Sequence, residues 1–115
     1  MVVHQTRDTA LDDNQVDRVF RALADATRRD IVRRTLTRDS SISDLAHRYE
    51  MSFAAVQKHI AVLETAGLVT KHRSGRERRV RGRPEALRTA QKLLHTYESI
   101  WQGRIDRLDA LLAEE

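Results

Sequence analysis

Side chains that could act as a nucleophile or a base are few in this chain of 115 residues, which contains no cysteine. Ser52 and His59 fall on one expected helix, but seven helical residues separate them by ~10.5 Å, too far for a nucleophile to hydrogen-bond its base. Asp106 and Asp109 stand among arginines, at a spacing typical of ion pairs along a helix. The four glycines are too scattered to form a phosphate-binding loop. We therefore expect no enzymatic activity.

Residues that bind metals are equally sparse. The absence of cysteine excludes disulfides and thiolate metal sites. His95 has Glu98 close by on the same expected helix, and His47 follows Asp44. A tight zinc site needs about four ligands, so pairs of this kind predict surface ion pairs. We expect no metal and no cofactor, and participation of His47 or His95 in an atypical metal site stays open.

Positive charge is concentrated between residues 71 and 83. Seven basic residues stand there against the single acid Glu77, although the net charge of the whole chain is only +4. Such a run often marks nothing more than a solvated face. Here it lies between turn signals on an otherwise slightly acidic protein, which indicates an anionic polymer as partner. The candidates for contact with a nucleic-acid backbone are Arg73, Arg76, Arg78 and Arg79.

The segment 52–67 has the pattern of a helix that can lie against DNA. Ser52 can cap its start and Gly67 can end it. Val56, Ile60 and Leu63 recur at helical spacing and predict a buried stripe. The opposite side is small near its start and carries one amide and one cation, with Ala54, Ala55, Gln57, Lys58 and Ala61. We expect this helix to enter the major groove.

Further capping residues place three helices before this one. A helix from Asp12 or Asp13 to about Ala24 is amphipathic, and Asp25 is suited to cap a second helix from Ala26 to about Leu36. We expect most of the arginines of the second helix to be solvated. Ser43 is the expected cap of a short helix through Tyr49, which together with the helix after Ser52 forms a helix-turn-helix.

The chain after residue 67 predicts a hairpin followed by one long helix. The run SGRE separates two short extended segments, and Pro84 suits the first turn of a helix of about 29 residues that ends near Ala113. Apolar residues recur at heptad spacing along this helix, so we expect it to pair with its copy in a second subunit. Gly103 permits close approach of the two helices, marks a bend or is simply tolerated. The expected dimer interface comprises Val16, Phe20, Leu94, Tyr97, Trp101 and Leu108.

These elements predict a single mainly α domain with a small β-hairpin. We expect residues 1–12 to be flexible and residues 13–115 to form the DNA-binding and dimerisation domain. Neither a signal sequence nor an apolar run of the ~18 residues that span a membrane is present in the sequence. We therefore expect a cytoplasmic protein.

The runs ALADATRRDIVRRTL and SISDLAHRYEMSFAAVQKHIAVLETAGLV, followed by a basic hairpin and a long helix, resemble the ArsR/SmtB family of dimeric winged-helix repressors. The resemblance covers about residues 14 to 113. It implies a winged helix-turn-helix that dimerises through its first and last helices. Ser52, Gln57, Lys58 and His59 match recognition-helix positions, although a structural role for His59 is at least as well supported. The Cys-x-Cys metal motif of many members is absent, because Asp44 to His47 occupy that place.

Two functions fit this sequence. The first is a homodimeric repressor that binds a palindromic operator in double-stranded DNA. The second is a dimeric protein-interaction module with only non-specific affinity for DNA, in which the long helix is the main surface and the basic hairpin is merely solvated. A protected palindrome in a footprint distinguishes the first from the second.

Overall fold

The computed structural model describes residues 12–114. The expectation of a flexible N-terminus concerns residues that lie outside this range, apart from Asp12. The order of elements is α2 (Asp13–Leu23), α3 (Ala26–Thr37), β1 (Ser40–Ser41), α4 (Ile42–Arg48), α5 (Phe53–Thr65), β2 (Val69–Ser74), β3 (Glu77–Gly82), the 3-10 turn η1 (Pro84–Ala86) and α6 (Leu87–Ala113). The mainly helical fold with a basic hairpin is confirmed.

Short polar side chains begin the helices, as the sequence predicts. Asp25 accepts a hydrogen bond from the backbone N–H of Arg28 at 3.0 Å, and Ser52 accepts one from that of Ala55 at 3.1 Å. Helix α5 ends at Gly67, whose φ of 77° lies in the left-handed region. The N–H of Gly67 donates to Glu64 and that of Leu68 donates to Leu63, which completes a Schellman motif.

The sheet has three strands, in the order β1-β3-β2, and all of its pairs are antiparallel. The hairpin of β2 and β3 was expected, but β1 was not. Ser40 pairs with Val80 and Ser41 pairs with Arg79. The prediction that Ser43 caps the following helix is wrong, because the Oγ of Ser41 accepts from Asp44 N at 3.0 Å. Pairing with β3 holds Ser41 in the extended conformation that a cap requires.

The core lies where the helices meet the base of the hairpin. Val56, Ile60 and Leu63 of α5 are fully buried, which confirms the predicted stripe. Leu68, Val69 and Val80 attach the hairpin to this core by one face, as expected. Apolar burial of this kind is the main stabilising contribution in a small domain. The outward face of α5 is therefore held at a fixed angle to the hairpin.

The arginines of α3 were expected to be mostly solvated; Arg29 and Arg33 are exposed, whereas Arg28 and Arg34 are partly buried. Arg28 donates to the carbonyl oxygens of Ala22 and Arg21, and Arg29 donates to that of Leu23. These carbonyl groups belong to the last turn of α2, where the regular helical partners run out, although that of Arg21 also accepts from the N–H of Ala24 at 3.2 Å. The two guanidinium groups therefore cap the C-terminus of α2.

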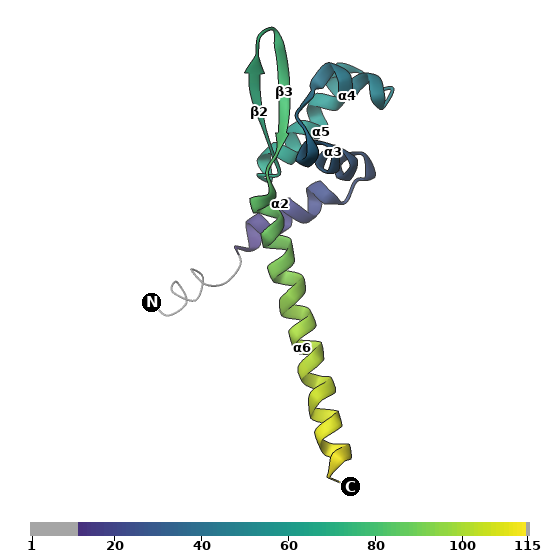
Figure 1. Ribbon diagram of the computed structural model, residues 1–115, viewed down its shortest axis with the longest axis vertical. Helices are drawn as coiled ribbons and strands as arrows, with labels where there is room; N and C mark the ends of the chain where they lie inside the picture. Colours follow the sequence, from purple (N-terminus) through teal and green to yellow (C-terminus); the bar gives the residue numbers. More distant parts are fainter. Residues whose placement is uncertain (1–11, 115) are drawn as a thin grey trace, which may run out of the picture.

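Helix α6 leaves the body of the domain after its first turns (Figure 1). Ala86 and Ala90 are buried, but Leu94 is 52% exposed and Trp101 is 57% exposed. The Cα trace accordingly extends over 69 × 37 × 20 Å. No helix within residues 12–114 is both long enough and apolar enough to cross a membrane. The apolar stripe of α6 is thus uncovered within one chain.

Candidate nucleic-acid interface

The outward face of α5 is small and lightly charged. Ala54 and Lys58 are exposed, and Ala55 and Gln57 are partly exposed. Ser52 is exposed at the N-terminus of the helix, where free backbone N–H groups favour anions. Phe53 is 46% exposed beside this face. The arrangement matches the surface that the sequence predicts for a helix in the major groove.

His59 lies against another helix of the same domain. Its side chain is only 20% exposed, and its Nδ1 atom is 3.9 Å from the Asp25 carboxylate. The same nitrogen is 3.3 Å from Nη1 of Arg28. The pKa of Asp25 is lowered from its ordinary value, mainly because its carboxylate accepts a hydrogen bond from the backbone N–H of Arg28. The side chains of His59 and Arg28 lower it further by electrostatic attraction. His59 therefore joins α5 to the start of α3, in agreement with the structural alternative.

The wing, which we define as β2, β3 and the turn between them, carries three exposed arginines near the tip. Arg73, Arg76 and Arg78 are exposed there. Arg79 differs from them, because its guanidinium donates to Glu77 at 2.8 Å and to the backbone oxygen of Asp39 at 3.0 Å. Three of the four predicted backbone contacts are thus presented to solvent, whereas the fourth has partners within the domain.

Asp39 connects the wing to the end of α3. Its carboxylate accepts two hydrogen bonds from Arg81, at 3.1 and 3.0 Å, and lies 3.2 Å from Nε2 of His72. The hydrogen bonds from Arg81 are the main reason that the pKa of Asp39 is lowered. The local sequence gives no signal for the role of Asp39, because its partners lie 33 and more residues away.

Tyr49 is a second residue that the sequence analysis did not identify. Its hydroxyl donates to the Asp30 carboxylate at 2.5 Å, which joins the end of α4 to α3. Burial and the hydrogen bond to Asp30 raise the pKa of Tyr49 to about 12. The same hydrogen bond, with one from Arg33, lowers the pKa of Asp30. The two residues are neighbours in space but 19 residues apart in the chain, so no local sequence pattern indicates their hydrogen bond.

The recognition helix and the wing share one surface. A shallow cavity runs between them, with α4 on its third side, so that all three elements border the same space. Its lining residues are Ser41, Ile42, Ser43, Phe53, Gln57, Arg76, Glu77 and Arg78. Gln57 of the recognition helix therefore shares this cavity with Arg76 and Arg78 of the wing, although 19 residues separate Gln57 from Arg76.

The residues expected to bind a partner copy lie along α2 and α6. Val16 and Phe20 are half-buried on α2. Their counterparts on α6 are exposed and form a stripe: Leu94, Tyr97, Trp101 and Leu108. In the part of the chain that the structure describes, no group of three or more His, Cys, Asp or Glu side chains is placed to hold a metal ion.

This geometry is that of a winged helix-turn-helix, and known proteins share it. The family model described as "Bacterial regulatory protein, arsR family" matches residues 25–71. An ArsR-like transcriptional regulator from Rhodococcus sp. RHA1 is 30% identical with a TM-score of 0.77, and the match covers 89% of this chain and 94% of that one.

Two further relatives indicate what such proteins do. The homodimeric winged helix-turn-helix domain of a possible ArsR-family regulator from Mycobacterium bovis is 25% identical with a TM-score of 0.59, over 76% of this chain and 82% of that one. The transcriptional repressor SdpR of Bacillus subtilis is 30% identical over 52% of this chain and 67% of its own length. The chain belongs to the ArsR family and is a transcriptional regulator with a DNA-binding winged helix-turn-helix.

Proposed function

We propose that the protein is a sequence-specific repressor that binds a palindromic operator in double-stranded DNA as a homodimer in the cytoplasm. The observation that carries this proposal is the shared surface of α5 and the wing, where Gln57, Arg76 and Arg78 border one cavity. A helix with small outward residues can enter the major groove. The exposed arginines beside it can then contact the phosphates that border the groove.

In this proposal α5 supplies the sequence preference. Ala54 and Ala55 let the helix backbone approach the bases, and Ser52 meets a phosphate. Gln57 is placed to pair with adenine through its amide, and Lys58 with guanine or a phosphate. Arg73, Arg76 and Arg78 of the wing contact the sugar-phosphate backbone, which adds affinity without sequence preference. Arg79 contacts DNA only if it leaves its partners on Glu77 and Asp39.

The dimer sets the spacing of the two recognition helices. The apolar stripe of α6 is exposed to water in a single copy, and pairing with the same stripe of a second copy buries it. The homodimeric relative from Mycobacterium bovis supports this assembly. Two-fold symmetry places the half-sites about 34 Å, or ~10 bp, apart or at a multiple of that distance. The relative SdpR supports repression, in which the bound dimer occludes a promoter.

Selection of bound DNA from a random pool tests the proposal. We expect an imperfect palindrome, and a footprint on the same sequence that protects both half-sites. Affinity for the selected DNA should fall by ~10³ or more between 50 and 200 mM salt if six or more phosphates are contacted. A dimer that enriches no sequence and protects no palindrome would identify the protein-interaction module instead.

Single substitutions separate the roles of the helix and the wing. Gln57→Ala should relax the sequence preference at one position per half-site, at a cost of about 1–3 kcal/mol against the selected DNA. Arg76→Ala and Arg78→Ala should weaken binding to all sequences alike and lower the salt dependence. Gln91→Ala and Arg88→Ala on exposed positions of α6 are the matched controls. The reverse pattern would show that the helix and wing roles are exchanged.

A further inference from the structure

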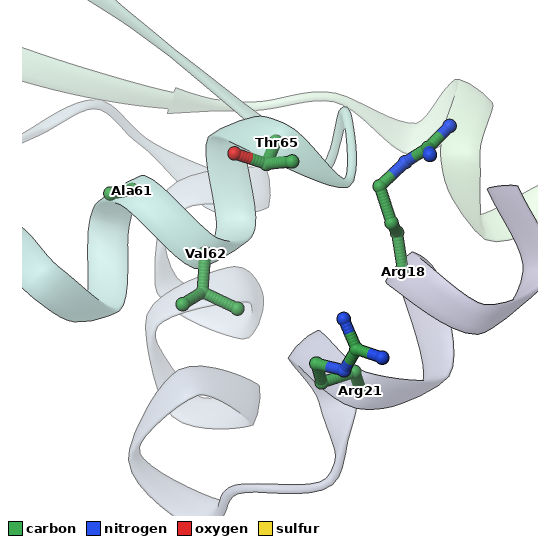
Figure 2. A pocket seen from close by; sticks show the side chains of 5 residues that line it. All are labelled: Arg18, Arg21, Ala61, Val62 and Thr65. Carbon is green, nitrogen blue, oxygen red and sulfur yellow. The ribbon is translucent and has the colours of Figure 1, made fainter. Parts of the chain in front are cut away.

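A cavity lies between α2 and α5, on a different part of the surface from the groove beside the wing. It has a volume of about 240 Å³ and is lined by Arg18, Arg21, Ala61, Val62 and Thr65. Figure 2 shows Arg21 at the α2 side of this space, and Arg18 with its stem beside the end of α5 and its guanidinium turned toward the segment that leads into α6. The cavity is smaller than the ~300–1,000 Å³ typical of sites for drug-sized ligands, so its occupant must be compact.

The charge in this cavity is positive and is not balanced by its lining. Two guanidinium groups border it, and none of the lining residues is acidic. Arg18 is held in place because its Nη2 donates to Oε1 of Gln15 at 3.0 Å. The Arg21 guanidinium has no hydrogen-bond or ion-pair partner within residues 12–114. Planar guanidinium groups match the geometry of a carboxylate, which they bind through paired hydrogen bonds.

The remaining lining is mainly apolar. Val62 is half-buried and Ala61 is exposed, and their methyl groups form the side of the cavity that α5 contributes. Thr65 completes the lining on α5. A ligand that is only an inorganic anion would leave these methyl groups uncovered. The lining therefore fits an anion that also has a short apolar part.

Arg18 and Arg21 lie away from the part of α2 that we assign to the dimer. Val16 and Phe20 are one turn apart and lie on the face of α2 that we assign to the dimer. Successive helical residues are rotated by about 100°, so Arg18 is about 200° from Val16 and Arg21 is about 100° from Phe20. The arginines thus lie on the side of α2 that faces α5, as Figure 2 shows.

We propose that this cavity binds a small organic carboxylate, with its carboxylate on Arg18 and Arg21 and its apolar part on Ala61 and Val62. Occupancy has a direct connection to the recognition helix. Gln15, which holds Arg18, also donates from Nε2 to the carbonyl oxygen of Ala66 at 3.1 Å. Ala66 is the C-cap of α5. A ligand that draws Arg18 inward therefore changes the contact that fixes the end of α5, and we infer that it changes operator affinity.

The binding claim is tested without DNA. Phenylacetate, its neutral analogue phenylacetamide and inorganic phosphate are titrated to ~20 mM into the isotope-labelled full-length protein, and backbone amide shifts are recorded. Phenylacetate should give saturable shifts at residues 61–66 and around Arg18 and Arg21, whereas phenylacetamide should give none. Arg18→Gln and Arg21→Gln should each weaken binding about tenfold or more, and the control Arg88→Gln should leave it unchanged.

Three results of this titration would overturn the proposal. They are no saturable shift with phenylacetate, equal binding by phenylacetate and phenylacetamide, and binding by phosphate alone. Dimerisation lost in Arg21→Gln at sedimentation equilibrium would also overturn it, since the arginine would then pair with a carboxylate of the partner copy. The amide spectrum of each variant also shows whether that variant is folded, so that lost binding can be assigned to the missing arginine.

The regulatory claim rests on the proposed function and has a separate test. Fluorescence anisotropy with the selected operator should show an affinity that changes with phenylacetate in the native protein, and not in Arg21→Gln. Thermodynamic linkage requires that the operator changes the affinity for phenylacetate by the same factor. Ligand binding with unchanged operator affinity would overturn the coupling alone. Absence of any operator would refute the proposed function and leave the binding result intact.

Discussion

At the scale of single residues, Tyr49 shows how one hydrogen bond joins the helix-turn-helix to the rest of the domain. Its hydroxyl is the link between the end of α4 and Asp30 of α3. Tyr49→Phe removes the donor and leaves Asp30 with Arg33 as its remaining partner. We expect a loss of about 1–2 kcal/mol in the free energy of unfolding, measured by urea denaturation at pH 7. An unchanged midpoint would show that the bond contributes nothing net.

The same pair predicts how stability depends on pH. The pKa of Tyr49 is raised from 10.0 to about 12, so its contribution is complete below pH 10 and is lost as the pH rises to about 12. The pKa of Asp30 is lowered, so its contribution is complete above the ordinary value of about 3.9 and is lost as the pH falls below it. Urea midpoints measured across both ranges should vary less in Tyr49→Phe than in the native protein.

Gly82 has a role that its position at the end of a strand does not reveal. A Cβ atom at Gly82 would lie 2.8 Å from the backbone nitrogen of Leu36 and 2.8 Å from the carbonyl carbon of Thr35. Gly82→Ala must push β3 away from α3, and we expect a loss of about 1–3 kcal/mol in unfolding free energy. The measurement is thermal or urea denaturation, and an unaltered stability would mean that the two backbones separate freely.

Gly103→Ala is the matched control for this prediction. A Cβ atom at Gly103 would meet only Nη1 of Arg107, at an ordinary 3.5 Å. Nothing within the described chain therefore requires glycine at this position of α6, and alanine should favour the helix by up to ~1 kcal/mol. Weaker dimerisation in Gly103→Ala would support close approach of two copies of α6 at this point, whereas unchanged dimerisation would support a tolerated glycine.

At the scale of elements, the wing is attached to the body through side chains as well as through the core. Asp39→Asn removes the charge that holds Arg81 and His72. We expect amide hydrogen exchange in β2 and β3 to become at least about threefold faster, while exchange in α3 and α5 stays constant, because exposed ion pairs affect local opening more than global unfolding. Asp109→Asn on α6 is the control. Faster exchange throughout the domain would show a structural defect instead.

The elements that sequence analysis predicted correctly are those specified by neighbouring residues. The caps at Asp25 and Ser52 and the left-handed glycine at residue 67 each depend on a window of about four residues. Errors arose where a residue depends on a distant partner. Ser43 was preferred to Ser41 as a cap, since the pairing of Ser41 with Arg79 has no local signal. The capping of α2 by Arg28 was missed because its acceptors lie six and seven residues earlier, beyond the turn that separates the two helices.

The candidate DNA site was only partly predictable. The residue types of α5 and the wing indicate which groups can meet bases and phosphates, and the structure brings Gln57 and Arg78 to one cavity. Sequence alone does not distinguish a free cation from an occupied one. Arg79 and Arg76 look equivalent in the chain, yet only Arg79 is bound to Glu77 and to the backbone of Asp39.

At the scale of the whole molecule, the exposed stripe of α6 determines the expected assembly. Trp101 is 57% exposed and has the guanidinium of Arg104 5.6 Å from its ring centroid. Trp101→Glu places a charge in the middle of the stripe, and we expect the dimer to dissociate into folded monomers at sedimentation equilibrium. Operator affinity should fall with it, because each monomer then binds one half-site alone.

The control for this prediction is Gln102→Glu, one position along the same helix and outside the stripe. Gln102 is exposed, so the same added charge should leave the dimer intact. Dimers that persist in Trp101→Glu would show that another face of the molecule joins the two copies.

The placement of β3 between β1 and β2 also has a consequence for how the chain folds as it is synthesised. β3 is the only partner of both other strands within the described residues, and it contributes the buried Val80. Residues 25–71, which include the recognition helix, therefore lack their sheet partner until residue 82 has been made. The pairing of Ser40 with Val80 joins residues 40 positions apart, and pairings over such a separation form slowly. A growing chain should thus remain unable to bind its operator until the second strand of the wing has left the ribosome.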